Sequence, residues 1–120
     1  MAAEYVLGER LLHDEQYGKP PSGLKTAHVI VAGGLGVLFA GNTITGVWNL
    51  WDSRHDETGR TRRLLHSILM LTADAVGVAA GDLGGSAKHS LASANLHRTV
   101  AISAMGVAMA GTFLMWFVRK

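Results

Sequence analysis

Residues 27–50 read AHVIVAGGLGVLFAGNTITGVWNL, an apolar run that contains no Asp, Glu, Lys or Arg. As an α-helix such a run spans about 30 Å or slightly more, which matches the hydrocarbon thickness of a bilayer. Two runs of similar length follow at about residues 64–84 and 99–118. Because a helix in lipid satisfies its own backbone hydrogen bonds, the sequence predicts three transmembrane helices.

The predicted fold class is therefore all-α: an integral membrane three-helix bundle over residues 24–120. Residues 1–23 precede it as a surface segment and linker, in which GKPPSG at 18–23 breaks any helix. Residues 3–17 form either a short amphipathic helix, on the membrane surface or on a partner, or a disordered tail. The acidic residues of this segment argue against a secretory signal peptide.

Basic residues predict the orientation. Three crossings place the N-terminus and the second loop on one side, and the first loop and the C-terminus on the other. Excess Lys and Arg near the helix ends marks the cytoplasmic side, so we expect the first loop and the C-terminus there, in a bacterial inner membrane or an organelle membrane. The richer side carries Arg54, Arg60, Arg62, Arg63, Arg119 and Lys120, against Lys19, Lys25, Lys88 and Arg98 on the other.

Composition excludes several classes of function. The chain has 120 residues, no cysteine, a mean hydropathy of +0.22 and a formal charge of only +2. Thiolate metal sites and disulfides are excluded, and no basic groove with interleaved aromatics points to nucleic acid. No nucleophile, hydrolytic triad or phosphate loop is visible, so we do not expect catalysis by this chain alone.

Small residues recur at four-residue spacing within the runs, which lets helix backbones approach closely in lipid. The lipid bilayer and other membrane subunits, or further copies of the chain, are therefore the expected partners. The predicted helix-packing positions are Gly36, Gly77, Gly81 and Gly106.

Asp74 lies midway along the second run, where a lone carboxyl group is costly. It is expected to face the bundle, either protonated or hydrogen-bonded by Asn42, Thr43 or Thr45. A role in a proton relay or a quinone site is the functional alternative.

Histidines stand where the predicted helices begin: His28 opens the first, His66 the second and His97 the third, and His89 lies in the loop before the third. His28 and His97 fall at similar depth on one side of the membrane, whereas His66 falls on the other. Small residues follow two of them along one helical face, a pattern that admits a flat macrocycle but is equally typical of plain packing. These are Ala101, Ala104, Ala108 and Gly111 below His97, and Ala73, Gly77, Ala80 and Gly81 below His66.

Imidazole is a common axial ligand of haem iron. Zinc usually takes three or four protein ligands, and the side of His28 and His97 offers only His89 besides, with no obvious carboxylate. Haem b bound by His28 and His97 is therefore the preferred hypothesis, with His66 and His89 as further candidate ligands. The alternative is that interfacial histidines only bond head groups or helix ends.

The order of these residues resembles the cytochrome b-561 type of transmembrane b-haem protein. The resemblance covers about residues 25–118 and rests on KTAH at 25–28, TRRLLH at 61–66 and LHRTVAI at 96–102. It implies that His28 and His97 share one haem. That family has four core helices and two haems, so His66 here lacks a partner unless oligomerisation supplies one. In architecture the chain is also similar to the small haem anchor subunits of quinone-linked dehydrogenases.

The sequence therefore favours a small membrane b-type cytochrome subunit that transfers electrons to or from a quinone or a partner subunit. The alternative is a non-catalytic structural subunit of a larger membrane complex, packed through its Gly and Ala seams. A small transporter or proton-path subunit centred on Asp74 would need to oligomerise.

Overall fold

The structure is a computed structural model that describes residues 1–19 and 21–117. Its described residues form four helices: α1 (Ala2–Tyr17), α2 (Ser22–Asp52), α3 (Arg60–Ala87) and α4 (Leu91–Phe117). Three of them, α2, α3 and α4, are long and apolar enough to cross a membrane. The predicted all-α class with three membrane-length helices is confirmed.

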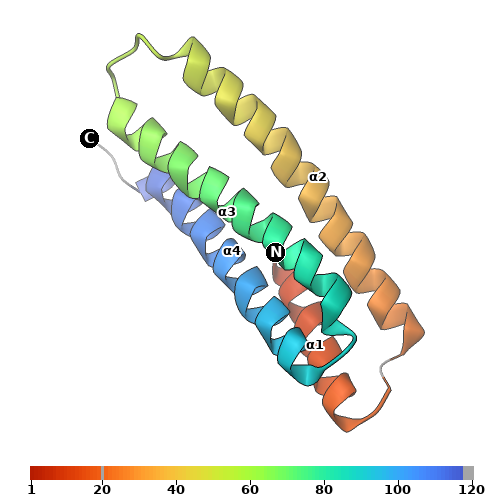
Figure 1. Ribbon diagram of the computed structural model, residues 1–120. Helices are drawn as coiled ribbons and strands as arrows, with labels where there is room; N and C mark the ends of the chain where they lie inside the picture. The colour runs from red at the N-terminus through yellow and green to blue at the C-terminus, as the bar shows by residue number, and fades with distance from the viewer. Residues whose placement is uncertain (20, 118–120) are drawn as a thin grey trace.

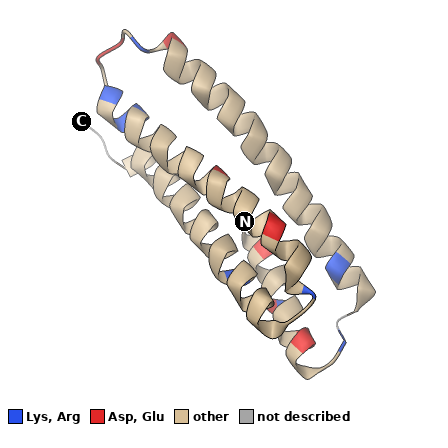
Figure 2. Cartoon of the chain, viewed as in Figure 1, with Lys and Arg blue, Asp and Glu red and all other residues tan. Residues whose placement is uncertain are grey.

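The helices form an elongated bundle of 56 × 22 × 20 Å (Figure 1). α3 and α4 run side by side in opposite directions, and α2 contacts α3. α1 lies at the end of the bundle where α2 begins, and it contacts both α2 and α4. Charged residues gather towards the two ends of the bundle, as a bilayer requires (Figure 2).

The N-terminal segment is a helix, the first of the two predicted alternatives, rather than a disordered tail. Because it packs against α2 and α4, the bundle has four helices among the described residues, which corrects the predicted three-helix bundle. Its acidic residues reach basic residues of the longer helices, which accounts for the docking. The long helices also extend beyond the predicted bounds of 27–50, 64–84 and 99–118 at the ends that the structure describes. Val118 lies outside the described residues.

The core lies between α3 and α4 and consists of small side chains. Ala108 is only 1% exposed, and no large side chain is fully buried among the described residues. Because the buried residues between them are alanine and glycine, the two backbones approach closely enough for polar side chains of one helix to reach carbonyl groups of the other. The buried small residues are Ala73 and Ala80 on α3, and Ala94, Ala104, Ala108 and Gly111 on α4.

Two cross-helix hydrogen bonds fix the register of α3 against α4. Nδ1 of His66 lies 2.9 Å from the carbonyl oxygen of Gly111, and Nδ1 of His97 lies 2.8 Å from that of Ala80. His66 and Ala80 stand fourteen residues apart on α3, as His97 and Gly111 do on α4. Each histidine therefore bonds to a small residue that lies fourteen positions after the other histidine on the opposite helix. The two bonds are related by an approximate two-fold axis.

The glycines predicted to mediate packing are not the points of closest approach within this chain. A methyl group added at Gly36, Gly77, Gly81 or Gly106 would meet no other atom within 4 Å. At Gly111 it would lie 3.3 Å from Sδ of Met70 and 3.4 Å from Cβ of Leu69. The four predicted positions remain candidates for contacts with other chains.

Replacing Gly111 by Val should loosen the α3–α4 contact, since the new side chain would collide with Leu69 and Met70. Overpacking of this kind costs about 1–3 kcal/mol. The measurement is the midpoint of detergent-induced unfolding, which should fall for Gly111→Val. Gly106→Val, on the same helix but in open space, is the matched control and should leave the midpoint nearly unchanged. Equal midpoints for both variants would contradict this packing.

Candidate functional site

Two histidines meet near one end of the bundle. The ring centres of His28 on α2 and His97 on α4 are 6.1 Å apart, and the ring planes are nearly perpendicular, at 87°. Among the described residues α2 and α4 do not approach within 8 Å, Cα to Cα. The two imidazoles therefore face each other across the space between helices that otherwise stay apart.

His97 is held in a defined orientation by the helix it packs against. Its Nδ1 lies 2.8 Å from the carbonyl oxygen of Ala80. A carbonyl oxygen only accepts, so Nδ1 carries the proton and Nε2 keeps its lone pair. Gly84 on α3 lies beside the ring, and a methyl group added there would come within 3.4 Å of Cε1 of His97. A larger residue at this position would push the ring aside.

Glu4 on α1 lies beside His28. Its Oε1 is 3.0 Å from Nδ1 of His28, and the two side chains are only 12% and 19% exposed, respectively. The two atoms are close but not aligned as a hydrogen bond, so the contact is electrostatic. The other carboxyl oxygen of Glu4, Oε2, is buried and has no hydrogen-bond partner in the described structure. Burial raises the pKa of Glu4, and the nearby N-terminal amine opposes this by lowering it.

This contact corrects the prediction that no carboxylate lies near His28 and His97. The carboxylate comes from the N-terminal helix, whose position the sequence did not reveal. Two further ion pairs hold α1 in place: Glu9 with Arg98 of α4, and Glu15 with Lys25 of α2, the latter at 3.3 Å. The acidic face of α1 thus covers the end of the bundle that contains the two histidines.

His66 and His89 lie apart from this pair. His66 stands near the start of α3 with its Nδ1 on the carbonyl oxygen of Gly111, 2.9 Å away, so its Nε2 is also left unprotonated. That assignment of Nε2 holds for the neutral ring. In the described structure no other histidine ring contacts His66. His89 is exposed in the turn between α3 and α4, where its backbone N–H donates to the carbonyl oxygen of Ser86.

The groove predicted below His97 is largely filled, whereas the one below His66 is filled at Ala73 and Ala80 and open at Gly77 and Gly81. Ala73 and Ala80 of α3, and Ala104 and Ala108 of α4, are buried within the bundle core. These positions therefore form a packing seam, since small residues on both helices allow the backbones to close the space. The pattern was present in the sequence, but the sequence could not show that the two faces meet.

Asp74 links α3 to α2 in the middle of the bundle. Of the three partners considered, Thr43 is the one observed: its hydroxyl group donates to Oδ2 of Asp74. Oδ1 of Asp74 is buried and has no hydrogen-bond partner in the described structure. Thr45 instead bonds to carbonyl oxygens of its own helix, at Gly41 and Asn42.

Within the described residues, no group of three or more His, Asp or Glu side chains is arranged to hold a metal ion. Comparison of the chain with family models, curated proteins and solved structures finds no match.

Thr43→Val should weaken the attachment of α2 to α3, because it removes the hydroxyl group that bonds Asp74. Hydrogen bonds between membrane helices contribute about 1 kcal/mol. Thr45→Val is the matched control, since that hydroxyl bonds only within α2. Unfolding in detergent should show a lower midpoint for Thr43→Val alone; the same midpoint for both variants would show that the bond contributes nothing.

Proposed function

We propose that the chain is a small membrane b-type cytochrome subunit that takes part in electron transfer. The observation that supports this most directly is the convergence of His28 and His97. A metal–imidazole bond is about 2 Å long. The ring centres of the two histidines are 6.1 Å apart, so both would be within reach of one metal ion between them.

The surroundings of these imidazoles also fit axial ligands. Metal-binding histidines usually donate their second ring N–H to a carbonyl or carboxylate oxygen, which fixes the ring and raises its basicity. His97 has the Ala80 carbonyl oxygen at Nδ1, so Nε2 is the nitrogen that remains for a ligand bond. Nδ1 of His28 lies 3.0 Å from Oε1 of Glu4, without the alignment of a hydrogen bond. The donor set therefore fits one haem iron between α2 and α4.

Haem b, when bound, supplies one-electron redox chemistry. His28 and His97 would hold the group, the Ala80 carbonyl would orient the ring of His97, and Glu4 would place a carboxyl group beside His28. The partial burial of these side chains would limit the access of water, which influences the redox potential. The electron partner is a quinone in the bilayer or an adjoining subunit. His66, with its Nε2 also unprotonated, is a candidate ligand for a second site completed by another chain.

A structural subunit of a larger membrane complex is the second candidate, and α2 favours it. No residue of α2 is fully buried in this chain. Its glycines at 33, 34, 36, 41 and 46 have no atom within 4 Å of an added methyl group. A helix with this open surface is suited to close contact with a neighbouring helix.

His28→Ala and His97→Ala should each abolish the same haem signal, because each removes one axial ligand. The measurement is the reduced-minus-oxidised visible spectrum of the protein purified after expression with haem supplied. His13→Ala is the matched control, since His13 is exposed on α1, and should retain the signal. A wild-type protein without Soret or α bands would exclude the cytochrome proposal and leave the structural one.

Glu4→Ala should weaken haem binding about 10- to 100-fold, the usual effect of removing a residue that orients a metal-binding histidine. The measurement is a haem titration of the protein followed at the Soret band. Glu15→Ala removes the same charge from the same helix but breaks only the pair with Lys25, and it should bind haem as the wild type does. Equal weakening by both variants would indicate that docking of α1, rather than the contact with His28, is what matters.

A further inference from the structure

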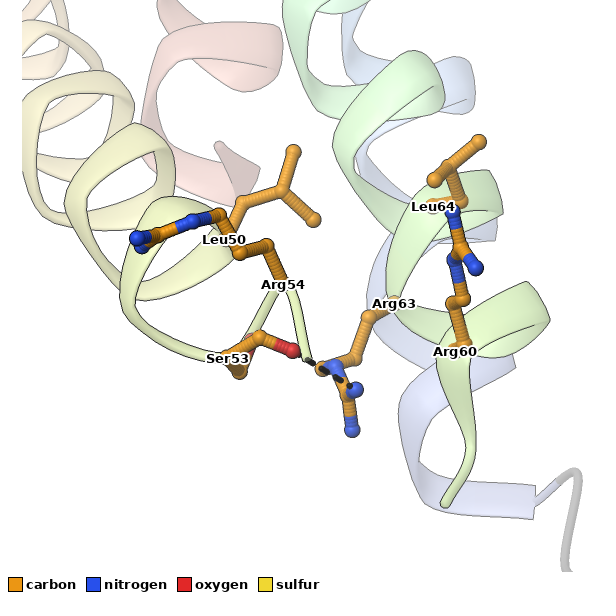
Figure 3. A pocket seen from close by; sticks show the side chains of 6 residues that line it. All are labelled: Leu50, Ser53, Arg54, Arg60, Arg63 and Leu64. Atoms are coloured by element: carbon orange, nitrogen blue, oxygen red, sulfur yellow. Dashed lines mark hydrogen bonds between the residues drawn. The ribbon is translucent and has the colours of Figure 1, made fainter. Parts of the chain in front are cut away.

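A pocket of about 100 Å³ lies where α2 ends and α3 begins, at the opposite end of the bundle from His28 and His97 (Figure 3). It is half open and combines basic and apolar walls. Leu50 and Leu64 line it at the ends of the two membrane helices, together with three arginines, of which Arg54 turns its guanidinium group away from α3 (Figure 3). The lining residues are Leu50, Ser53, Arg54, Arg60, Arg63 and Leu64.

Arg63 is fixed at the edge of the pocket by the loop that joins α2 to α3. Its guanidinium group donates to the carbonyl oxygens of Ser53, Asp56 and Thr58, the first at 3.4 Å (Figure 3). It also lies 3.4 Å from Oδ2 of Asp56, which is more than half exposed. The carbonyl groups carry no net charge, so the exposed Asp56 carboxylate is the only formal counter-charge on Arg63 among these contacts.

The other two arginines are exposed. The guanidinium group of Arg54 lies over the ring of Trp51, 4.6 Å from the ring centroid. It also donates to the backbone carbonyl oxygen of Trp51, at 2.8 Å. Arg60 extends along α3 towards Leu64, and its side chain has no hydrogen bond or ion pair in the described structure (Figure 3). The guanidinium group of Arg60 is therefore available to a ligand.

The start of α3 adds to the positive potential. The helix begins without a side-chain cap and without an acidic residue in its first turn. The uncapped N–H groups of a helix N-terminus attract anions. Four arginines against Asp52, Asp56 and Glu57 leave residues 52–63 with a net positive charge.

The position of the pocket decides the class of ligand. Trp48 and Trp51 are exposed near the same end of α2, as expected where a helix leaves the hydrocarbon for the head-group region. A ligand bound here has an anionic group at the arginines and an apolar part along Leu50 and Leu64. We propose that this pocket binds the phosphate head group of an anionic membrane phospholipid, with Arg60 as the principal contact.

The test uses the full chain purified in a neutral detergent and titrated with short-chain phosphatidylglycerol or phosphatidylcholine, with bound lipid counted by native mass spectrometry. Phosphatidylglycerol should bind more tightly than phosphatidylcholine. Arg60→Gln should weaken its binding about fivefold, the effect of one basic residue at a membrane surface. Arg10→Gln removes the same charge from an exposed position on α1 and should bind phosphatidylglycerol as the wild type does.

Three results would overturn the proposal: equal affinity for the two lipids, equal weakening by Arg10→Gln and Arg60→Gln, or displacement of phosphatidylglycerol by inorganic phosphate at the same concentration. The last would identify a site for free anions rather than for a lipid. Unchanged helix content by circular dichroism shows that Arg60→Gln leaves the fold intact. Since neither lipid nor variant touches His28 or His97, the result is independent of haem binding.

Discussion

The close approach of α3 and α4 is the constraint on which the rest of the molecule depends. Because only alanine and glycine are buried between them, each backbone comes within reach of the other helix's histidine. The same contact places Ala80 and Gly84 beside the ring of His97. α2 contacts this pair through one intramembrane hydrogen bond and one histidine contact, and α1 contacts α2 and α4 through charged side chains.

The two ends of the bundle differ in chemistry. At the end covered by α1, Glu4, Glu9 and Glu15 each lie beside a basic residue of α2 or α4. The end formed by the loop between α2 and α3 leaves Arg60 unpaired among the described residues and exposes two tryptophans. The acidic residues of α1 are thus matched within the chain, whereas Arg60 at the other end is not.

The sequence was sufficient to predict the membrane helices, because the length of each apolar run is read directly from it. It was also sufficient to predict that His28 and His97 lie near each other, because the order of the crossings places both on one side of the membrane. It was insufficient to place Glu4 beside His28, since the docking of a short helix depends on contacts between residues far apart in the chain. The carbonyl partners of His66 and His97 were equally hidden, because every residue carries a carbonyl group. The small-residue stripes were visible, but whether they faced a cofactor or each other depended on how α3 turns towards α4.

The approximate two-fold relation between the His66–Gly111 and His97–Ala80 bonds has a consequence for topology. Viewed from either end, the α3–α4 pair presents a histidine bonded across to a small residue of the opposite helix. These two bonds alone therefore do not distinguish one end of the hairpin from the other. α1 and α2 break the relation, because His97 is the histidine that they approach, so a nearly symmetric pair of contacts becomes part of an asymmetric molecule.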